Sequence, residues 1–590
     1  MVEIEIPGKM QSKTPQFDAV LDEILKDLVP HTRTCIWKGK NPHCEGDFDI
    51  VAEDIEFLKM LRVPAPNYCP TCRRIRRLPH MGMLQLFKRP CNTPGHNEMM
   101  ISIFAENCPF PVYDYKYFIS DEFDPFAFGV DYNPNDDHLN ILWELRKRFP
   151  MPSFLNRDPA SVNSDYSNGG RNTKNAYYTG GCFESEDMWY TNFANKSKMV
   201  MDSRTIRGSD HVYSSVYGGH LYKCAFTYFT SNSTDSMFLF DCRNCQDCFG
   251  CVNLRNKRYC VWNEQYTKEE YEAFMQSIRP LSRTKIREYE EKFWKMVKEL
   301  PMNASHNLAS ENVSGVNIVN SHNLYDVIDA QKAENVRHAD SPLGHHDSMD
   351  LTFSGGSDHL YGTVNIGSSS SWVKFSVSSK YCTDSEFIFN SKNLSNCFMC
   401  FGLQNKSYCI LNKQYEEDEY FKIVDAIKTK LLQRGEYGDG FGFEYSAQAY
   451  NISLAQIAYS LTEEQIKMFG GYVASEPETN VGTIPVIEAI DVPQTIEETT
   501  DDILEKAIRC EKTGKPFRVI PSELAFYRKM QLPVPVVHPQ VRMGKYLLVA
   551  PTGKMFKAMC AKCSKDIFSI FDPKEGWNLY CGSCYQQEVA

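Results

Sequence analysis

A short pattern that returns about every twelve residues constrains the fold of this chain more than any other feature. Between residues 175 and 262 a polar pair is followed by a small or apolar residue and then by aromatic or β-branched residues. Short fixed periods indicate stacked supersecondary units, which bury a continuous core only by stacking on their neighbours. Twelve residues are too few for a pair of helices and fit one strand and a turn. The pattern therefore predicts a β-solenoid in which two passes, about two dozen residues, make one coil. It occurs at Lys174-Asn175-Ala176, Glu186-Asp187-Met188, Ser197-Lys198-Met199, Asp210-His211-Val212, Tyr222-Lys223-Cys224, Thr234-Asp235-Ser236, Gln246-Asp247-Cys248 and Arg258-Tyr259-Cys260.

The same pattern resumes at about residue 312 and runs to residue 411 as a second copy of the first. Residues 234–240 match residues 383–389, and residues 256–260 match residues 405–409. Each copy is followed by a predicted helix. The capping box Thr267-Lys268-Glu269-Glu270 opens the first, which an amphipathic stretch from Thr284 to Leu300 extends. The second is expected from about Glu416 to Gln433.

The two ends of the chain are also copies of one another. Residues 57–66 lead to Cys69-Pro70-Thr71-Cys72, and residues 526–535 lead with the same spacing to His538-Pro539-Gln540-Val541. Further on, Phe87-Lys88-Arg89-Pro90-Cys91 aligns with Phe556-Lys557-Ala558-Met559-Cys560. Each end therefore consists of two sub-modules in series, and opposite halves have kept their cysteines.

Two complete sets of four cysteines remain, one in each end module. Two Cys-x-x-Cys knuckles separated by a short excursion supply the four thiolates of a tetrahedral structural zinc site, and a closed shell leaves no position for a substrate. In the N-terminal set the first knuckle, Cys35 and Cys44, is stretched by six residues relative to the other copy, so buried free thiols are the alternative there. We therefore predict two structural Zn²⁺ ions per chain and no catalytic or cofactor-binding residue. The predicted ligands are Cys35, Cys44, Cys69 and Cys72 for one ion and Cys560, Cys563, Cys581 and Cys584 for the other.

The other halves of the end modules have lost most of these ligands. Pro94, Asp114 and Tyr117 stand where the C-terminal copy has Cys563, Cys581 and Cys584. Cys91, His96 and Cys108 nevertheless leave a distorted metal site open as an alternative. In the C-terminal copy only Cys510 remains of the first set, with Thr513, His538 and Val541 at the other three positions.

Four cysteines spaced three apart, Cys242, Cys245, Cys248 and Cys251, raise the alternative of an iron–sulfur cluster. In the second copy Ser391 and Leu394 replace the first two, whereas Cys397, Cys400 and Cys409 persist. This favours a column of buried thiols. An additional zinc ion at Cys248, Cys251 and Cys260 is the remaining alternative.

The formal net charge of −11 argues against non-specific nucleic-acid binding, which depends on neutralising phosphates. One basic run is a local exception: Arg73, Arg74, Arg76 and Arg77 follow the Cys69/Cys72 knuckle directly. Such a patch could hold a phosphate backbone. The alternatives are a solvated basic loop and a salt-bridged contact between domains.

Asp-His pairs recur in both copies of the repeat. Gly208-Ser209-Asp210-His211 returns as Gly356-Ser357-Asp358-His359, and a histidine beside a carboxylate can act as a general base. Appearance at the same place in both copies favours a turn in which these side chains satisfy backbone groups. A solenoid-face enzyme using Asp210, His211, Asp358 and His359 stays an alternative.

The chain of 590 residues contains 22 cysteines, no basic n-region with an apolar core near its start, and no run of eighteen apolar residues. With zinc-type spacings this predicts a cytoplasmic or intracellular protein without membrane association. Residues 474–505 contain nine acidic residues and no basic one, which is typical of a linker extended along the surface. The fold class is mainly β with helices: two duplicated β-solenoid domains flanked by duplicated zinc-ribbon-like end modules. The predicted order is an N-terminal helix (1–30), a zinc-knuckle module (31–150), a first solenoid repeat (160–265), a helical segment (266–302), a second solenoid repeat (305–412), a helix (413–434), an irregular segment with the acidic linker (435–502) and a second zinc-ribbon module (503–590).

The order of cysteine knuckle, proline-rich elbow, repeats containing Cys-Phe-Gly-Cys-Val-Asn-Leu-Arg-Asn-Lys (248–257) and a closing segment at 506–518 resembles a family of uncharacterised zinc-ribbon and β-solenoid repeat proteins. These are frequent in candidate-phyla bacteria and occur in giant viruses. Some carry the label CoA-transferase, but no feature of this sequence supports acyl-CoA chemistry. The resemblance implies no activity, and it makes a virion-associated structural protein compatible with the sequence.

The sequence favours a non-enzymatic zinc-binding scaffold or adaptor that binds a protein partner or assembles with itself. The alternatives are a nucleic-acid-binding or ribosome-binding zinc-ribbon protein and the solenoid-face enzyme.

Overall fold

A computed structural model of the protein describes residues 12–82, 85–155, 158–367, 369–477, 481–547 and 553–589. The structure is mainly β with helices and contains several sheets, of which two are large. No helix in these ranges has the length and apolar character that crossing a lipid bilayer requires. The parts of the predicted domains at residues 1–11, 83–84, 368, 478–480, 548–552 and 590 lie outside the described residues.

The first large sheet has twelve strands, and its path is almost entirely parallel. Each strand pairs with the segment about twelve residues further along the chain, so that Lys198 is opposite Glu186 on one side and Asp210 on the other. A register equal to the spacing of the sequence pattern places residues of the same type one above another. We call this sheet the first ladder. Its strands are β7 (Lys174–Tyr177), β8 (Glu186–Trp189), β9 (Asn192–Asn195), β10 (Lys198–Met201), β11 (Arg204–Arg207), β12 (Asp210–Tyr213), β13 (Val216–Gly219), β14 (Tyr222–Tyr228), β15 (Met237–Phe240), β16 (Gln246–Val252), β17 (Arg258–Val261) and β18 (Glu264–Gln265).

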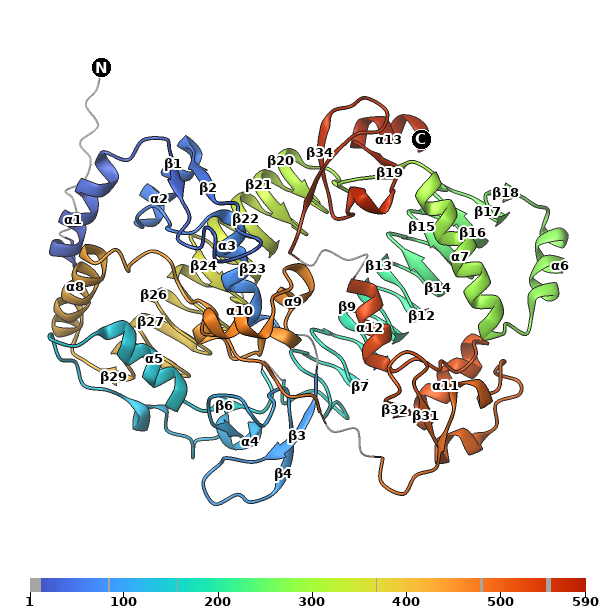
Figure 1. Cartoon of the computed structure of the whole chain (residues 1–590), viewed down its shortest axis with the longest axis horizontal. Coiled ribbons are helices and arrows are strands. Elements are labelled where there is room, and N and C mark those ends of the chain that lie inside the picture. Colours follow the sequence, from blue (N-terminus) through green and yellow to red (C-terminus); the bar gives the residue numbers. More distant parts are fainter. Residues whose placement is uncertain are drawn as a thin grey trace.

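The second ladder has ten strands in sequence order. His322 is opposite Glu334, which in turn is opposite His346, again a step of twelve residues. Figure 1 shows the two ladders side by side, and the rings of Phe193 and Phe353 stack 5.5 Å apart between them. The strands of the second ladder are β20 (Glu311–Val316), β21 (His322–Ile328), β22 (Glu334–Leu343), β23 (His346–Gly355), β24 (Tyr361–Val364), β25 (Ser371–Lys374), β26 (Thr383–Glu386), β27 (Lys392–Phe398), β28 (Gln404–Ile410) and β29 (Lys413–Gln414).

One corner of each ladder explains why the sequence pattern contains so many Asn and Asp residues. The second residue of most pattern triplets has a positive φ, for example 53° at Asn175 and 56° at Asp187. Asn and Asp adopt this left-handed conformation more readily than other non-glycine residues. Their side chains also bond along the column, with Asn175 Nδ2 donating to Asp187 Oδ1 at 2.8 Å. In the second ladder Asn335 donates to Asp347 at 2.9 Å in the same way.

The ladder interiors contain the cysteines for which the sequence left three interpretations open. Cys242, Cys245, Cys248, Cys251 and Cys260 form one buried cluster with Leu239. Within the described residues, no group of metal-ligating side chains gathered around one point includes any of these thiols. Several of the sulfurs instead lie near backbone carbonyls, as Cys251 Sγ does at 3.4 Å from the oxygen of Phe249. The column of buried thiols is therefore the arrangement present.

We expect thiol reagents to miss these side chains in the native protein. Cys248, Cys251 and Cys260 in the first ladder and Cys397, Cys400 and Cys409 in the second are all buried. A thiol that no solvent reaches cannot react until the segment opens. Mass spectrometry after brief alkylation should therefore find these six unmodified under native conditions and modified in denaturant, whereas rapid native labelling would contradict the buried column.

Helices are present after each ladder, as the sequence predicts. Thr267 caps α6 (Lys268–Ile278) with a complete capping box, and α7 (Arg283–Glu299) follows and buries Phe293 against the first ladder. On the second ladder lies α8 (Glu417–Gln433), which also contacts α1 (Pro15–Lys26). In α1, Phe17, Leu21 and Leu25 are buried. Ile24, which the sequence places on the same apolar face, is 39% exposed.

The end modules pack crosswise on the ladders. In Figure 1 the blue N-terminal elements lie beside the yellow second ladder, and β31, β32, α11 and α12 of the C-terminal module lie beside the teal first ladder. The N-terminal module contains β1 (His31–Thr34), β2 (Asp47–Ile50), α2 (Ala52–Leu61), α3 (Pro70–Arg77), β3 (Phe87–Pro90), β4 (Met99–Ser102), β5 (Val112–Tyr113), α4 (Tyr115–Phe118), α5 (His138–Arg148) and β6 (Met151–Pro152). The C-terminal module contains β30 (Val486–Ile487), β31 (Ala507–Arg509), β32 (Pro516–Arg518), α11 (Pro521–Met530), α12 (Pro539–Leu547), β33 (Phe556–Met559), β34 (Asp566–Ser569), β35 (Leu579–Tyr580) and α13 (Gly582–Val589). Between α6/α7 and the second ladder, β19 (Met302–Asn303) pairs with β35.

The segment expected to be an acidic linker is partly built into the C-terminal module. Strand β30 pairs with β31, and Val492, Ile496 and Ile503 are buried. The acidic composition concealed these apolar residues, which pack into the core shared by the first ladder and the C-terminal module. Before this segment in the sequence lie α9 (Leu454–Ala458) and α10 (Glu463–Met468), which pack with the N-terminal module. One contact is the hydrogen bond from Leu454 N–H to the carbonyl of Met81 at 3.0 Å.

Candidate metal centres and the contacts they organise

The first candidate metal centre brings together all four predicted thiols. Cys35 and Cys44 lie in the loop between β1 and β2, whereas Cys69 caps α3 and Cys72 lies in its first turn. The four sulfur atoms lie within 4.8 Å of one another, and Cys44 and Cys69 are 4.0 Å apart. A tetrahedral zinc site with Zn–S bonds of about 2.3 Å has S···S edges of about 3.8 Å. The group is therefore compact enough to bind one metal ion.

The second candidate centre has the same composition in the C-terminal module. Cys560 follows β33, Cys563 lies in the turn to β34, Cys581 follows β35 and Cys584 lies in α13. Their sulfur atoms also lie within 4.8 Å of one another, with Cys563 and Cys581 at 3.8 Å. The backbone N–H of Cys581 donates to Cys560 Sγ at 3.2 Å. Cys563 is exposed, whereas the other three are buried.

The crowding of thiols perturbs their acidities in opposite directions. Hydrogen bonds from the Cys69 and Cys72 thiols lower the pKa of Cys35 to about 2. The hydrogen bond with Cys35 raises the pKa of Cys69 to about 12. One thiol of the group thus ionises readily, and the negative charge of that thiolate opposes ionisation of a second thiol beside it. A bound cation removes that opposition, which is why four thiols in one cluster favour a metal ion.

The four arginines after Cys72 face the second ladder. Arg73, Arg74, Arg76 and Arg77 are between 4% and 7% exposed. Arg73 and Arg77 both pair with the buried Asp350, Arg77 at 2.9 Å. These arginines are therefore not available to a phosphate backbone, which corrects the sequence-based proposal of a nucleic-acid patch. Unpaired charges are costly to bury, so α3 has to pack where aspartates can pair with its arginines.

Arg74 and Arg76 of the same helix, α3, also have partners. Arg74 Nε donates to Asp340 Oδ1 at 3.0 Å, and Arg76 donates to the carbonyl of Gly440 at 2.9 Å while lying over the ring of Tyr68. Asp340 belongs to β22 and Asp350 to β23, so α3 spans two neighbouring strands. The salt-bridged domain contact, one of the alternatives left open by the sequence, is what the structure contains.

The helix at the second centre closes on the first ladder in an analogous way. Tyr585, the residue after Cys584, is 3% exposed. Its hydroxyl donates to Asp241 Oδ2 at 2.7 Å and lies 2.8 Å from Asn253 Oδ1. Asp241 is 1% exposed and also pairs with Arg255. Each four-cysteine group therefore lies at the start of a helix that contacts one ladder through a buried aspartate.

The crosswise packing repeats at equivalent positions of the two end segments. Arg542 aligns with Arg73 and forms a buried ion pair with Asp202 at 2.7 Å. Asp202 precedes Asp350 by 148 residues, the spacing that also separates the two Gly-Ser-Asp-His sequences. Arg542 is thus present although His538 and Val541 stand at the positions aligned with Cys69 and Cys72. An arginine at both aligned positions, with cysteine neighbours at only one of them, is a sequence signal that could have indicated a packing role.

A second equivalent pair lies next to the first. Glu523 aligns with Asp54, and its carboxylate accepts from the buried Tyr190 hydroxyl at 2.7 Å. Asp54 in turn pairs with Arg337 at 2.7 Å and with His338, which follows Tyr190 by the same 148 residues. Burial raises the pKa of Glu523 from 4.5 to about 7, although Arg542 opposes that change.

This raised pKa predicts a pH-dependent stability. A carboxyl group with a higher pKa in the folded state binds its proton more tightly there, so its contribution is present below about pH 4.5 and is lost as the pH rises through about 7. Gln keeps an acceptor for the Tyr190 hydroxyl but does not titrate. The unfolding free energy of Glu523→Gln and of the unmodified chain can be measured by urea denaturation. We expect the difference, variant minus unmodified chain, to rise between pH 5 and pH 8 by up to about 3 kcal/mol. A difference that does not change with pH would contradict this assignment.

Near Cys91, three side chains form a further group of potential metal ligands. Cys91, His96 and Glu98 each place a ligand atom within 4.8 Å of the others. Cys108, which the sequence suggested as a third ligand, instead accepts from Arg89 at 3.0 Å and lies outside that group. Sequence spacing did not single out Glu98. Cys510 Sγ accepts from the backbone of His538 at 3.2 Å.

The Asp-His pairs occupy the corner column of the ladders. His211 and His359 have φ values of 59° and 55° and are members of the left-handed series. His211 Nδ1 lies 2.8 Å from Asp210 Oδ1, and the ring of His359 stacks on that of Trp372 at 4.2 Å. Turn geometry therefore accounts for the two histidines, but the expected hydrogen bonds to backbone groups are not formed at His211, whose ring nitrogens have no hydrogen-bond partner among the described residues.

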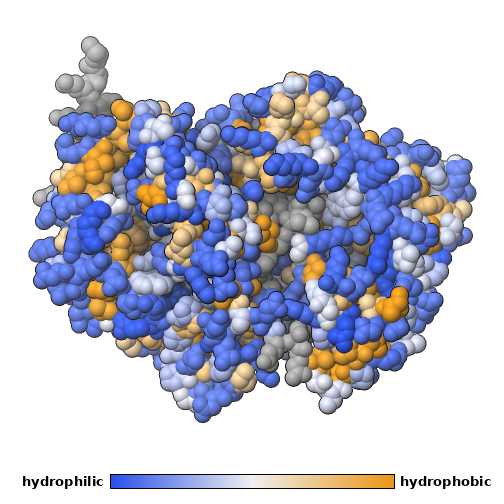
Figure 2. All heavy atoms as spheres, viewed as in Figure 1, coloured by the Kyte–Doolittle hydropathy of each residue, from blue (hydrophilic) through white to orange (hydrophobic). Residues whose placement is uncertain are grey.

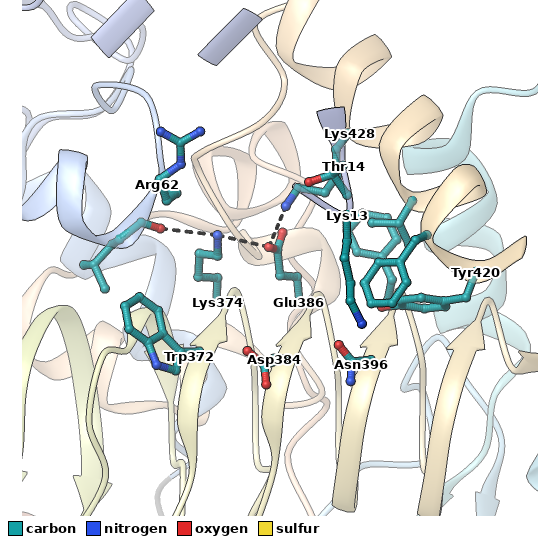
Figure 3. A pocket seen from close by; sticks show the side chains of 14 residues that line it. Lys13, Thr14, Arg62, Trp372, Lys374, Asp384, Glu386, Asn396, Tyr420 and Lys428 are labelled. Carbon is teal, nitrogen blue, oxygen red and sulfur yellow. Dashed lines mark hydrogen bonds and ion pairs between the residues drawn. The ribbon is translucent and has the colours of Figure 1, made fainter. Parts of the chain in front are cut away.

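A small pocket of about 220 Å³ lies between the second ladder, α8 and the start of α1 (Figure 3). Lys374 and Lys428 both pair with Glu386, at 3.0 and 2.8 Å. Burial lowers the pKa of Lys374 to about 8. Burial raises the pKa of Glu386, but Lys374 and Lys428 together bring it down to about 2. The three charges satisfy one another and tie α8 to the ladder.

Comparisons with known proteins add little to this description. No model of a protein family matches the chain, and no curated protein matches it. Four chains of solved structures match. One of them, described as a "putative acetyltransferase" from Desulfovibrio desulfuricans G20, is 10% identical with a TM-score of 0.08. That match covers 39% of this chain and 60% of the other. A TM-score this low supports no conclusion on fold or activity, so function has to be inferred from the metal centres and their contacts.

Proposed function

We propose that this protein is a zinc-stapled scaffold. Its two ladders are β-solenoid arms derived from one duplicated repeat, and its end modules are zinc-ribbon-like clasps, also duplicated. The observation that carries the proposal is that each four-cysteine group begins a helix whose side chains close on a ladder, Arg73 and Arg77 on Asp350 and Tyr585 on Asp241. Closed thiolate shells stabilise without offering a position for substrate, which supports a structural role for both ions.

The crosswise packing supports a rigid frame rather than a string of separate domains. Each arm is held by the end module that is more distant in sequence, so the arms cannot separate unless the clasps open. We infer that the frame presents its surface to a protein partner or to further copies of itself. On the face drawn in Figure 2, hydrophobic residues lie near the position of β31 and β32, and the surface around them is largely hydrophilic. Scattered apolar residues are normal on a surface, so the partner has to be found by experiment.

Metal analysis of the full chain tests the structural part of the proposal. We expect two zinc ions per chain, with no visible absorption. Removing them with a chelator under mildly denaturing conditions should open both end modules and leave the ladders folded. Iron with visible absorbance, or a chain that holds no zinc and remains folded, would contradict the proposal.

The scaffold role is tested by chemical crosslinking and mass spectrometry on the native complex, together with light scattering for self-assembly. We expect a protein partner or an oligomer whose retention is lost in the zinc-free chain. We expect no tight nucleic-acid binding, because the basic run that suggested a phosphate-binding patch is buried. Tight, salt-dependent binding to nucleic acid would therefore contradict the scaffold role.

A further inference from the structure

A hairpin of the N-terminal module holds a set of three different metal-ligating side chains. Cys91 follows β3, and His96 and Glu98 precede β4. One ligand atom from each lies within 4.8 Å of the other two. We propose that Cys91, His96 and Glu98 bind a third divalent metal ion, of the zinc class, in an open site. This proposal does not depend on the scaffold function.

The backbone of the hairpin is shaped to bring these side chains together. Cys91 N–H donates to the carbonyl of Glu98 at 3.1 Å, and His96 N–H donates to that of Thr93 at 3.1 Å. Gly95 takes a φ of 80° between them, a conformation that suits glycine. The turn thus brings Glu98 back opposite Cys91. Imidazole Nδ1 of His96 already lies 2.7 Å from Glu98 Oε1, and a bound ion would replace that contact.

The equivalent place in the C-terminal module is the complete four-thiol group. There Cys560 occupies the position of Cys91, and the next turn supplies Cys563, where the N-terminal copy has Pro94. His96 and Glu98 come from the same turn, slightly further along. The hairpin has therefore exchanged sulfur ligands for nitrogen and oxygen while keeping its first cysteine. Thiolate, imidazole and carboxylate are all ordinary zinc ligands.

Three protein ligands leave one position of a tetrahedral ion open. The Asp114 carboxylate, at the position of Cys581, does not fill it, because it caps α4 by accepting from the backbone of Lys116 at 2.9 Å and Tyr117 at 3.2 Å. The side chains of His96 and Glu98 are 37% and 59% exposed, so the ion is accessible. Unlike the closed shells, this site can take a water molecule or a single carboxylate, thiolate or imidazole donor from outside.

Cobalt binding to the zinc-loaded full-length chain tests the proposal. We expect one equivalent of Co²⁺ to bind beyond the two zinc ions, with the intense visible bands of four-coordinate cobalt and one thiolate-to-cobalt transition. Cys91→Ser should abolish the thiolate transition. Glu98→Gln changes an exposed side chain, cannot unfold the core, and should weaken binding at least about tenfold. Cys108→Ser is the matched control and should bind cobalt normally, since Cys108 lies outside the group.

Three outcomes would overturn the assignment. The chain could bind no cobalt beyond the two closed sites. Binding could survive in both Cys91→Ser and Glu98→Gln, which would place the ion elsewhere on the surface. Loss of binding in Cys108→Ser with normal binding in Glu98→Gln would replace Glu98 by Cys108 as the third ligand.

Discussion

Replacing Cys69 with serine is expected to release one zinc ion per chain and to detach α3 from the second ladder. Serine is a good N-cap, so it can still accept the N–H of Cys72 that Cys69 Sγ accepts at 3.4 Å. The substitution therefore removes a metal ligand and leaves the helix start intact. Because structural zinc supplies about 10–16 kcal/mol of folding free energy in small modules, losing one of four ligands should cost several kcal/mol. Hydrogen exchange of residues 70–77 and of β22 and β23 should accelerate together.

Cys382→Ser is a suitable control for that experiment. Cys382 is a buried thiol of the second ladder, and Ser370 occupies the corresponding place one step earlier, where its hydroxyl oxygen accepts from the backbone N–H of Cys382 at 3.1 Å. Serine is thus already tolerated in this column, and zinc content and exchange should stay as in the unmodified chain. If Cys69→Ser retains two zinc ions, or loses one without any change at β22 and β23, the metal does not hold the clasp closed.

The second large effect is expected at Asp350. Asp350→Asn keeps the shape of the side chain and leaves Arg73 and Arg77 buried without a full counterion. Breaking a buried ion pair by removing one partner costs about 3–5 kcal/mol, most of it from the uncompensated charge. We expect docking of the N-terminal module to weaken by that amount, measured as a lower urea midpoint followed at the buried tryptophan Trp37. Asp202→Asn should weaken the C-terminal module in the same way, through Arg542.

Two comparisons separate burial from charge. Asp47→Asn removes the exposed partner of Lys38 and should cost less than about 1 kcal/mol. Combining Asp350→Leu with Arg73→Met and Arg77→Met removes all three charges and should recover much of the loss, because the penalty arises from burying an unpaired charge. A loss below about 1 kcal/mol in Asp350→Asn would show that the arginines find other partners or water.

The sequence predicted those features that depend on local spacing. The twelve-residue pattern agrees with the register of the ladders, since a strand and a turn of fixed length must return to the same height. Capping residues marked the start of α6 because N-caps act within three residues. The eight predicted metal ligands come together in two groups, since each knuckle supplies two ligands from one turn.

The tertiary structure alone decided which surfaces meet. Arg73 and Asp350 are 277 residues apart, and nothing local in either neighbourhood specifies the other. The same basic run is therefore equally compatible, as a sequence, with a phosphate-binding patch and with a buried clasp. Burial and counterions distinguish the two, and both arise only when the chain folds back on itself. Glu98 was missed for a related reason: it faces Cys91 across a hairpin whose closure depends on β3 pairing with β4. Short-range periods and knuckles are fixed by chain geometry, whereas crosswise docking is fixed by where opposite charges can be buried together.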